Sequence, residues 1–209
     1  GIGKAMAKII AATTAIETLY LIGRSEPQNM PQGARFIAAD ITNESQLEAA
    51  ADIVKSGGPL DMVLIMTGLL HGHTIAPEKN ARQMDMKAFE QSFAVNCFGP
   101  ALIGKHFLPL MHRNQKSVFA ALSARIGSIS DNRLGGWYAY RASKAALNMI
   151  LKTLSIEYGR RFKQMVILGL HPGTVDTGLS KPFQSNVPEG KLFTPDYSAE
   201  RLLTVIDNA

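Results

Sequence analysis

The sequence lacks the features that mark secreted, membrane-spanning and metal-binding proteins. It has a single cysteine, Cys97, so no disulfide can form within the chain, which suits a reducing compartment. No apolar run approaches the roughly 20 residues of a membrane-spanning helix, and no secretory leader is visible. His71 and His73 have no cysteine or carboxylate partner at ligand spacing, so we expect no metal. The sequence therefore predicts a cytoplasmic protein without membrane contact.

Long runs of like charge and hydrolase motifs are absent as well. Lysine and arginine total 22 against 17 aspartates and glutamates, which gives a net charge of +5, and the basic residues are scattered. We therefore expect no nucleic-acid partner, and at most some attraction for a phosphorylated ligand. No Gly-x-Ser-x-Gly motif supports a serine hydrolase. Cys97 lies in an apolar helical run, where it is more simply a small core residue than a nucleophile.

What the sequence does have is a regular alternation of short apolar runs and helical patterns. With 209 residues, 46% of them hydrophobic, it can form one core, and we expect a single domain over residues 1–209. The runs predicted as strands are 19–22, 35–39, 62–66, 118–122 and 165–170. The alternation predicts an α/β fold with a Rossmann-type, doubly wound parallel sheet, in which ligands bind at the carboxyl ends of the strands.

The chain begins at Gly1-Ile2-Gly3, without an initiator methionine and with helical sequence at once. We expect that an N-terminal strand is missing before this point, and that the C-terminal end is incomplete too. A parallel sheet without its first strand would have unpaired backbone in its middle. Farther along, Pro100 should kink the long helix from Phe89 to Ile103, and residues 171–195 show no regular pattern.

The segment Tyr140-Arg141-Ala142-Ser143-Lys144 opens a helical pattern, which places Tyr140 and Lys144 one turn apart on the same face. A phenol ordinarily titrates near about 10, and a fixed ammonium beside it stabilises the phenolate and lowers its pKa. The pair is therefore a candidate proton donor and acceptor. Taken alone, the same spacing also describes an ordinary surface pair.

Several residues suit a dinucleotide. Gly1 and Gly3 could let the backbone approach a pyrophosphate at a helix N-terminus, or could form a plain turn. Arg24 follows the first predicted strand, where arginine can clamp a ribose 2′-phosphate, so we expect NADP; alternatively it only faces water. Asp40 follows the second predicted strand and could accept a hydrogen bond from adenine, or could serve only as a helix cap. Asn96 is an amide in an apolar helical run that could hold a water or bond a neighbouring backbone.

Serines and a Pro-Gly turn follow the last two predicted strands. Ser123, Ser128 and Ser130 precede Tyr140 by 10 to 17 residues, and a hydroxyl there could hold a substrate carbonyl, although loops are generally rich in serine. In the segment 171–177 the proline fixes the direction of the chain, the glycine allows a ligand to approach closely, and the threonines could bond a carboxamide. Alternatively, the segment is only a tight turn. The histidine of that segment, His171, is more simply structural than catalytic.

Together these features resemble the short-chain dehydrogenase/reductase family over essentially the whole chain. Gly1-Ile2-Gly3 is similar to the end of its Thr-Gly-x-x-x-Gly-x-Gly loop, Asp40 to its adenine-contacting aspartate, and Asn96 to its helix asparagine. The segment Tyr140 to Lys144 matches Tyr-x-x-x-Lys, and the segment Pro172 to Thr177 matches the Pro-Gly segment that contacts nicotinamide.

The stretch from Ser123 to Ile129, with Gly135-Gly136-Trp137, resembles more particularly the C-factor subgroup, which is similar to sniffer-like carbonyl reductases. Besides the missing first strand and early glycine-loop residues, two departures from the family pattern matter. The turn after the strand at 62–66 keeps only Gly68. Ala124 falls on the usual catalytic serine, so Ser123 or Ser128 would have to supply the hydroxyl.

The resemblance implies an oxidoreductase that uses NADP, or else NAD, to reduce a ketone or aldehyde to an alcohol. Hydride would come from nicotinamide and the proton from Tyr140. Lys144 would bind the nicotinamide ribose and lower the pKa of Tyr140, and Asn96 would hold a water linked to Lys144. The implied cofactor-binding residues are Gly1, Ile2, Gly3, Arg24, Asp40, Ile41, Gly68, Tyr140, Lys144, Pro172, Gly173, Val175 and Thr177. The alternative is a catalytically weak cofactor-binding protein with a signalling or interaction role.

The resemblance also implies a homodimer or homotetramer built on the two long helices. Candidate contact residues are Phe107, Leu108, Met149 and Leu154, unless these pack inside the monomer. The substrate pocket would be formed by residues 180–195 and the loop around His71. An apolar wall could come from Phe183, Phe193 and Trp137.

Overall fold

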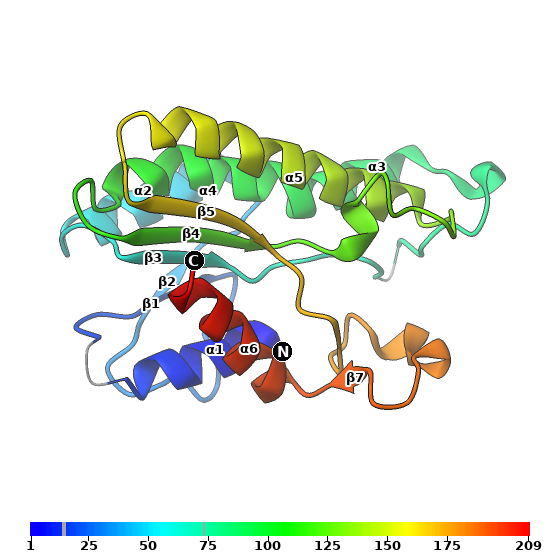
Figure 1. Cartoon of the computed structure of the whole chain (residues 1–209), viewed down its shortest axis with the longest axis horizontal. Helices are drawn as coiled ribbons and strands as arrows, with labels where there is room; N and C mark the ends of the chain where they lie inside the picture. Colours follow the sequence, from blue (N-terminus) through cyan, green and yellow to red (C-terminus); the bar gives the residue numbers. More distant parts are fainter. Residues whose placement is uncertain (14–15, 73) are drawn as a thin grey trace. The chain divides into compact units, whose positions relative to one another are not determined.

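The computed structural model describes residues 1–13, 16–72 and 74–209. They form two compact units. The first unit comprises Gly1–Pro59 and Pro172–Ala209, and the second comprises Leu60–His171. Figure 1 shows the helices and strands of both. His73, considered together with His71 as a metal ligand, lies outside the described residues.

A first parallel strand pair and three helices are among the described elements of the first unit. Strands β1 (Tyr20–Gly23) and β2 (Arg35–Ala38) pair in parallel, as predicted. Helix α2 (Glu44–Lys55) begins where the side chain of Asn43 accepts the N–H of Gln46, 3.2 Å away. Its buried residues are those that the helical spacing predicts, Leu47, Ala50, Ala51 and Val54. Helices α1 (Ile2–Ala11) and α6 (Pro195–Asp207) pack against each other.

The segment that shows no regular pattern in the sequence has more structure than expected. Strands β6 (Thr174–Val175) and β7 (Leu192–Phe193) pair in parallel, with a 3₁₀ segment, Lys181–Asn186, between them. Strands of two residues are too short to leave an alternating pattern. Gly173 precedes β6 with φ of +76°, and a Cβ there would lie 2.6 Å from the Phe193 ring, so this turn requires glycine.

The second unit is built on a three-stranded parallel sheet. Its strands β3 (Met62–Ile65), β4 (Ser117–Leu122) and β5 (Met165–Leu170) lie in that order, and every residue of the central strand is buried. Helix α5 (Tyr138–Gly159) packs on β5 and on α4 (Gly99–Phe107). In Figure 1 these helices and α3 (Met86–Phe93) cover one face of the sheet. All five strands predicted from apolar runs are therefore present in the two units.

The predicted long helix is interrupted as its proline suggests. Residues Ala94–Phe98, between α3 and α4, form a π-helical turn. Pro100 has no N–H, so the carbonyl of Asn96 cannot receive the usual bond from four residues onward, and the helix widens just before the proline. Asn96 lies within this widened turn.

Two of the expected subunit contacts are wrong. Phe107 and Leu108 are buried within the second unit, at 3% and 0% exposure, so they cannot lie at a subunit contact. Leu154 is half-buried and lies against Gly104, whereas Met149 is exposed. The oligomeric state itself stays a prediction.

Within the three described ranges, no helix is long and apolar enough to cross a membrane.

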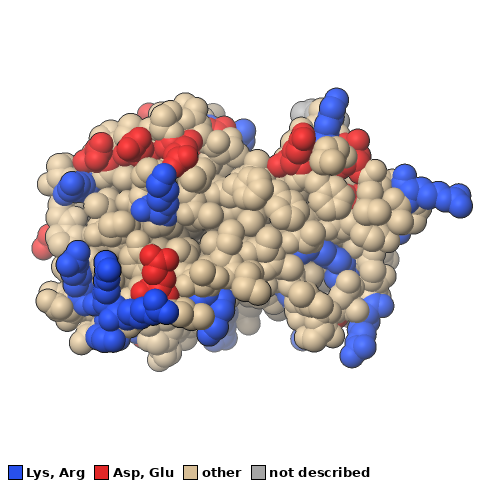
Figure 2. Space-filling view, turned by 90° about the horizontal axis from the view of Figure 1, so that it is seen from above, with Lys and Arg blue, Asp and Glu red and all other residues tan. Residues whose placement is uncertain are grey.

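On the face drawn in Figure 2, basic side chains occur together with acidic ones and with a broad neutral area. This mixture accords with the scattered lysines and arginines of the sequence.

Candidate active site

The first turns of α5 carry a buried phenol and a buried amine. Tyr140 is 8% exposed and Lys144 2% exposed. The Lys144 Nζ lies 5.9 Å from the centre of the Tyr140 ring and donates a 2.7 Å hydrogen bond to the carbonyl of Leu122, at the end of β4. The predicted juxtaposition one helical turn apart is therefore present, and it lies at the carboxyl end of a central strand.

The predicted lowering of the Tyr140 pKa is wrong in this structure. Burial raises the pKa of Tyr140 to about 12, because the phenolate loses its hydration. Burial also lowers the pKa of Lys144 to about 8, against a smaller opposing effect from Cys97. The ammonium is itself poorly solvated and bonds the Leu122 carbonyl, so it favours the phenolate too little to outweigh the desolvation of the phenol. At neutral pH the phenol keeps its proton and can donate it.

Asn96 pairs with a backbone. Its Nδ2 donates to the carbonyl of Leu69 at 2.7 Å, and its Oδ1 accepts the N–H of Leu69 at 2.8 Å. Nδ2 also donates to the Ser143 hydroxyl at 3.2 Å, and that hydroxyl donates to the carbonyl of Tyr140 at 2.9 Å. Both amide hydrogens are thus used, so the backbone alternative is correct, while the water linked to Lys144 stays a prediction.

The glycine that the family pattern keeps after β3 lies beside these side chains. A Cβ on Gly68 would be 3.8 Å from the Asn96 Oδ1 and 4.0 Å from the Lys144 Nζ. The π-helical turn, the end of β3 and the start of α5 therefore meet around one amine.

The two candidate serines differ in how their hydroxyls are held. The Ser123 hydroxyl donates a 2.6 Å bond to Oδ1 of Asn148, which is two helical turns beyond Tyr140. Among the described residues, the Ser128 hydroxyl has long contacts of 3.4 Å, with the Ser130 hydroxyl and the N–H of Asp131. Ser128 is therefore the hydroxyl less committed to another partner.

The residue before Ser128 brings it close to α5. A Cβ on Gly127 would lie 2.8 Å from the backbone carbon of Lys144, so only glycine fits there without a shift. Ala124, which the resemblance aligns with the family serine, is the residue before the 3₁₀ turn Arg125–Gly127.

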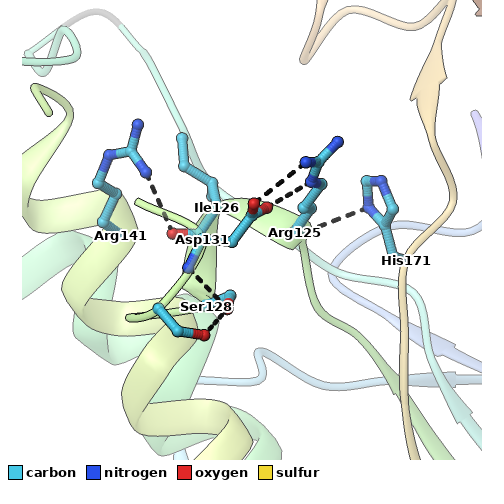
Figure 3. Close-up of polar contacts among 7 residues, drawn as sticks. Arg125, Ile126, Ser128, Asp131, Arg141 and His171 are labelled. Atoms are coloured by element: carbon cyan, nitrogen blue, oxygen red, sulfur yellow. Dashed lines mark hydrogen bonds and ion pairs between the residues drawn. The ribbon is translucent and has the colours of Figure 1, made fainter. Parts of the chain in front are cut away.

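Arg141 is a structural residue that the sequence does not single out. Its guanidinium donates to the carbonyls of Gly136 at 2.9 Å and Gly135 at 3.0 Å, and to that of Ile126 at 3.5 Å. Figure 3 shows it beside the loop that carries Ser128. It fastens this loop to the start of α5.

His171 has the structural role predicted for it. Its Nδ1 accepts the backbone N–H of Arg125 at 3.4 Å, and its pKa is lowered by burial and by the charge of Arg125. The Arg125 side chain pairs with Asp131 (Figure 3). The neutral imidazole thus helps to fix the turn after β4.

Glu78 was also missed, because it lies in a polar stretch without a pattern. It is only 4% exposed, and its carboxylate accepts the N–H of Ala139. Glu78, Ala139 and Tyr140 line one small hollow, whose other walls are mainly apolar. Trp137, proposed as an apolar wall, has its ring edge-on to that of Tyr140, with centres 6.4 Å apart.

In the first unit, the glycine turn and the Pro-Gly segment come together. Gly1 precedes α1 without a capping side chain, and a Cβ on Gly1 would lie 3.6 Å from the Thr177 methyl. Gly3 and Ile2 belong to the first turn of α1. Ser198 of α6 donates to the carbonyl of Pro172 at 2.9 Å and holds the segment in place.

Arg24 and Asp40 follow β1 and β2 in this unit. The Oδ1 of Asp40 accepts the N–H of Thr42 at 2.9 Å and its hydroxyl at 2.7 Å, and these bonds, with a smaller effect from Arg24, lower the pKa of Asp40. Asp40 closes the turn that contains Ile41, whereas the cap of α2 is Asn43. Arg24 is exposed.

Comparison with known proteins identifies the family and the fold. Residues 1–188 match the short chain dehydrogenase family. The C-signal protein of Myxococcus xanthus is 35% identical over 124 residues, which cover 59% of this chain and 69% of that protein. The NADPH-bound carbonyl reductase from chicken fatty liver is similar with a TM-score of 0.83 at 24% identity, covering all of this chain and 88% of the other. The carbonyl reductase Sniffer of D. melanogaster has a TM-score of 0.84 at 18% identity and the same coverage. The Rossmann-type α/β fold is thereby confirmed, and the chain belongs to the short chain dehydrogenase family.

Proposed function

We propose that this oxidoreductase uses NADP, or less readily NAD, to reduce a small ketone or aldehyde to an alcohol. The observation that carries the proposal is the buried Tyr140 phenol, one turn from the buried Lys144 amine at the end of β4. A phenol whose pKa is about 12 stays protonated at neutral pH and can act as a general acid, which favours reduction over the reverse oxidation.

The chain's own residues fit a dinucleotide. The uncapped glycine at the start of the ten-residue helix α1 leaves backbone N–H groups for a pyrophosphate. The exposed Arg24 after β1 suits a 2′-phosphate, and Asp40, with Ile41, suits the adenine. The similar carbonyl reductase from chicken fatty liver has NADPH bound, which supports the same choice of cofactor. Pro172, Gly173, Val175 and Thr177 would contact the nicotinamide.

When bound, the cofactor supplies the hydride. Tyr140 gives its proton to the substrate oxygen, and the Ser128 hydroxyl holds that oxygen. Lys144 would bond the cofactor ribose and, while charged, would favour the phenolate left by proton transfer. Asn96 holds the backbone of Leu69 and so fixes Gly68 beside Lys144.

The test is NADPH oxidation with a panel of ketones, aldehydes and quinones. Tyr140→Phe should bind NADPH normally and lower kcat by roughly 10² to 10⁴, the usual value of general acid catalysis. Tyr138→Phe, in which a half-buried phenol on the same helix loses its hydroxyl, is the matched control and should keep its kcat. Wild-type turnover in Tyr140→Phe would refute the assignment.

The second candidate function is cofactor binding in a signalling or interaction role. Ala124 at the family serine position and the similarity to the C-signal protein favour it. It predicts tight NADPH binding with no turnover of any carbonyl compound by the wild type, so the same assay separates the two functions.

A further inference from the structure

The catalytic helix begins without any of the usual local caps. Its N-cap residue, Trp137, makes no side-chain cap bond, and its backbone is left-handed with φ of 54° and ψ of 46°. Gly135 and Gly136 before it also have positive φ, of 65° and 64°. A tryptophan in this conformation is strained, so the surrounding structure must hold it there.

Glu78, 61 residues earlier in the chain than Ala139, supplies the missing contacts. Its backbone carbonyl accepts the N–H of Trp137 at 2.5 Å. Its carboxylate accepts the N–H of Ala139 through both oxygens, at 3.3 and 3.4 Å. A Cβ on Gly136 would lie 3.2 Å from the Glu78 carbonyl oxygen, so the two segments are in close contact. Two N–H groups at the start of α5 are thus satisfied by one residue.

The charge and burial of Glu78 suit this place. A carboxylate is favoured at a helix N-terminus, where the helix dipole is positive. At 4% exposure the carboxylate is nearly removed from water, and the Ala139 N–H compensates for part of that loss. Because Tyr140 follows Ala139 directly, the Glu78 bond acts one residue from the phenol.

We propose that Glu78 is the positioning residue of the active site: its carboxylate fixes the first turn of α5 and thereby the orientation of Tyr140. The inference rests on the proposed function of Tyr140. Without the bond to Ala139, the strained start of the helix can relax, and the phenol moves relative to the substrate oxygen.

Four variants of the whole chain test it. Glu78→Ala and Glu78→Met remove the acceptor, and Met keeps the side-chain volume in case Ala impairs folding. Glu78→Gln keeps an oxygen that can accept from Ala139. Asn80→Ala is the matched control, because Asn80 caps a 3₁₀ turn in the same loop through the N–H of Arg82.

In a turnover assay with NADPH, Glu78→Ala and Glu78→Met should lower kcat by about 10- to 100-fold, since displacement of a catalytic group by about 1 Å has effects of this size. The Kd for NADPH should stay within about twofold. Glu78→Gln should recover kcat to within about threefold of wild type, and Asn80→Ala should match wild type. Unchanged kcat in Glu78→Met, or a Gln variant as slow as Met, would overturn the proposal.

Trp137 gives a readout that does not depend on turnover, because it is the only tryptophan in the chain. Loss of the Glu78 anchor should shift its emission and increase its quenching by acrylamide in Glu78→Met, but not in Glu78→Gln or Asn80→Ala. If the wild type turns over no carbonyl compound, the proposed function fails while this measurement still decides whether Glu78 anchors the helix. Identical emission in Glu78→Met and wild type would show that it does not.

Discussion

The two units hold their candidate residues in opposite ways. In the second unit Tyr140, Lys144 and Asn96 are almost fully buried, and the amine and the amide are hydrogen-bonded to backbone carbonyls or N–H groups. In the first unit Arg24 is exposed, and the carboxylate of Asp40 accepts bonds from Thr42 in its own turn. One set is held by the surrounding protein, and the other lies open to a ligand.

This difference predicts which substitutions change the stability of the fold and which change only the affinity for a ligand. A buried polar group or charge destabilises a fold unless it is bonded, so its removal changes stability and turnover together. An exposed side chain contributes little to stability, so its removal should change ligand affinity alone.

The largest effect should come from Lys144→Met. We expect kcat to fall by about 10²-fold or more, because the charged group that stabilises the phenolate is lost. The free energy of unfolding of the wild type should rise by up to about 3 kcal/mol between pH 8 and pH 10.5, since the unfolded chain keeps the amine protonated there and the folded chain, with a pKa of about 8, does not. Lys144→Met should lack this rise. Urea unfolding at several pH values measures it.

The Tyr140 phenol also titrates differently in the folded chain, with a pKa of about 12, which lowers stability above about pH 10. This effect is shared by wild type and Lys144→Met, so it largely cancels in their difference. Lys144→Met also removes the bond to the Leu122 carbonyl. That loss changes the free energy of unfolding by a similar amount at every pH, so it does not alter the pH dependence. A parallel pH dependence in both proteins would contradict the buried, destabilised ammonium.

The sequence predicts the fold well because the fold depends on patterns that repeat. Each parallel strand is a run of apolar residues, and α2 buries the face that its spacing indicates. The strand pair β6 and β7 escaped prediction, because two residues cannot show an alternation. The π-helical turn was foreseen only as a kink, since Pro100 indicates where a hydrogen bond is lost and not how the backbone responds.

The candidate site was predictable where residues lie close in sequence and not where they meet only in the fold. The spacing of Tyr140 and Lys144 fixes their juxtaposition on a helix. The pKa of Tyr140 could not be predicted, because it depends on burial by distant segments. Glu78 and Arg141 act through backbone N–H and carbonyl groups, which leave no mark in a sequence.

Arg24→Asp should show the opposite behaviour to Lys144→Met. We expect the Kd for NADPH to rise by about 10- to 100-fold, because a charge-assisted bond to the 2′-phosphate is replaced by repulsion. The Kd for NADH should change by less than about threefold, and the free energy of unfolding by less than about 0.5 kcal/mol. Fluorescence titration and urea unfolding measure the two quantities.

Arg35→Asp is the matched control for Arg24→Asp. Arg35 is also exposed on the β1–β2 sheet, but it lies at the amino end of its strand, away from the end that Arg24 follows. Both cofactors should bind this variant as they bind the wild type. Equal losses of NADPH affinity in the two variants would indicate a general effect of charge, and Arg24 would then have no specific role.

The smallest expected effects on turnover and stability are those of Ser128→Ala and Ser123→Ala in the second unit. Ser128→Ala should lower kcat by about tenfold, the value of one hydrogen bond of about 1.4 kcal/mol to the substrate carbonyl, with stability almost unchanged because its hydroxyl has only 3.4 Å contacts. Ser123→Ala should instead lower the free energy of unfolding by about 1 kcal/mol, because it removes the bond to Asn148, and keep kcat within about twofold. Steady-state kinetics and urea unfolding of both variants decide the point. If Ser123→Ala loses turnover and Ser128→Ala keeps it, the hydroxyl that faces Asn148 here must turn toward the substrate during catalysis, and Ser123 takes over the role proposed for Ser128.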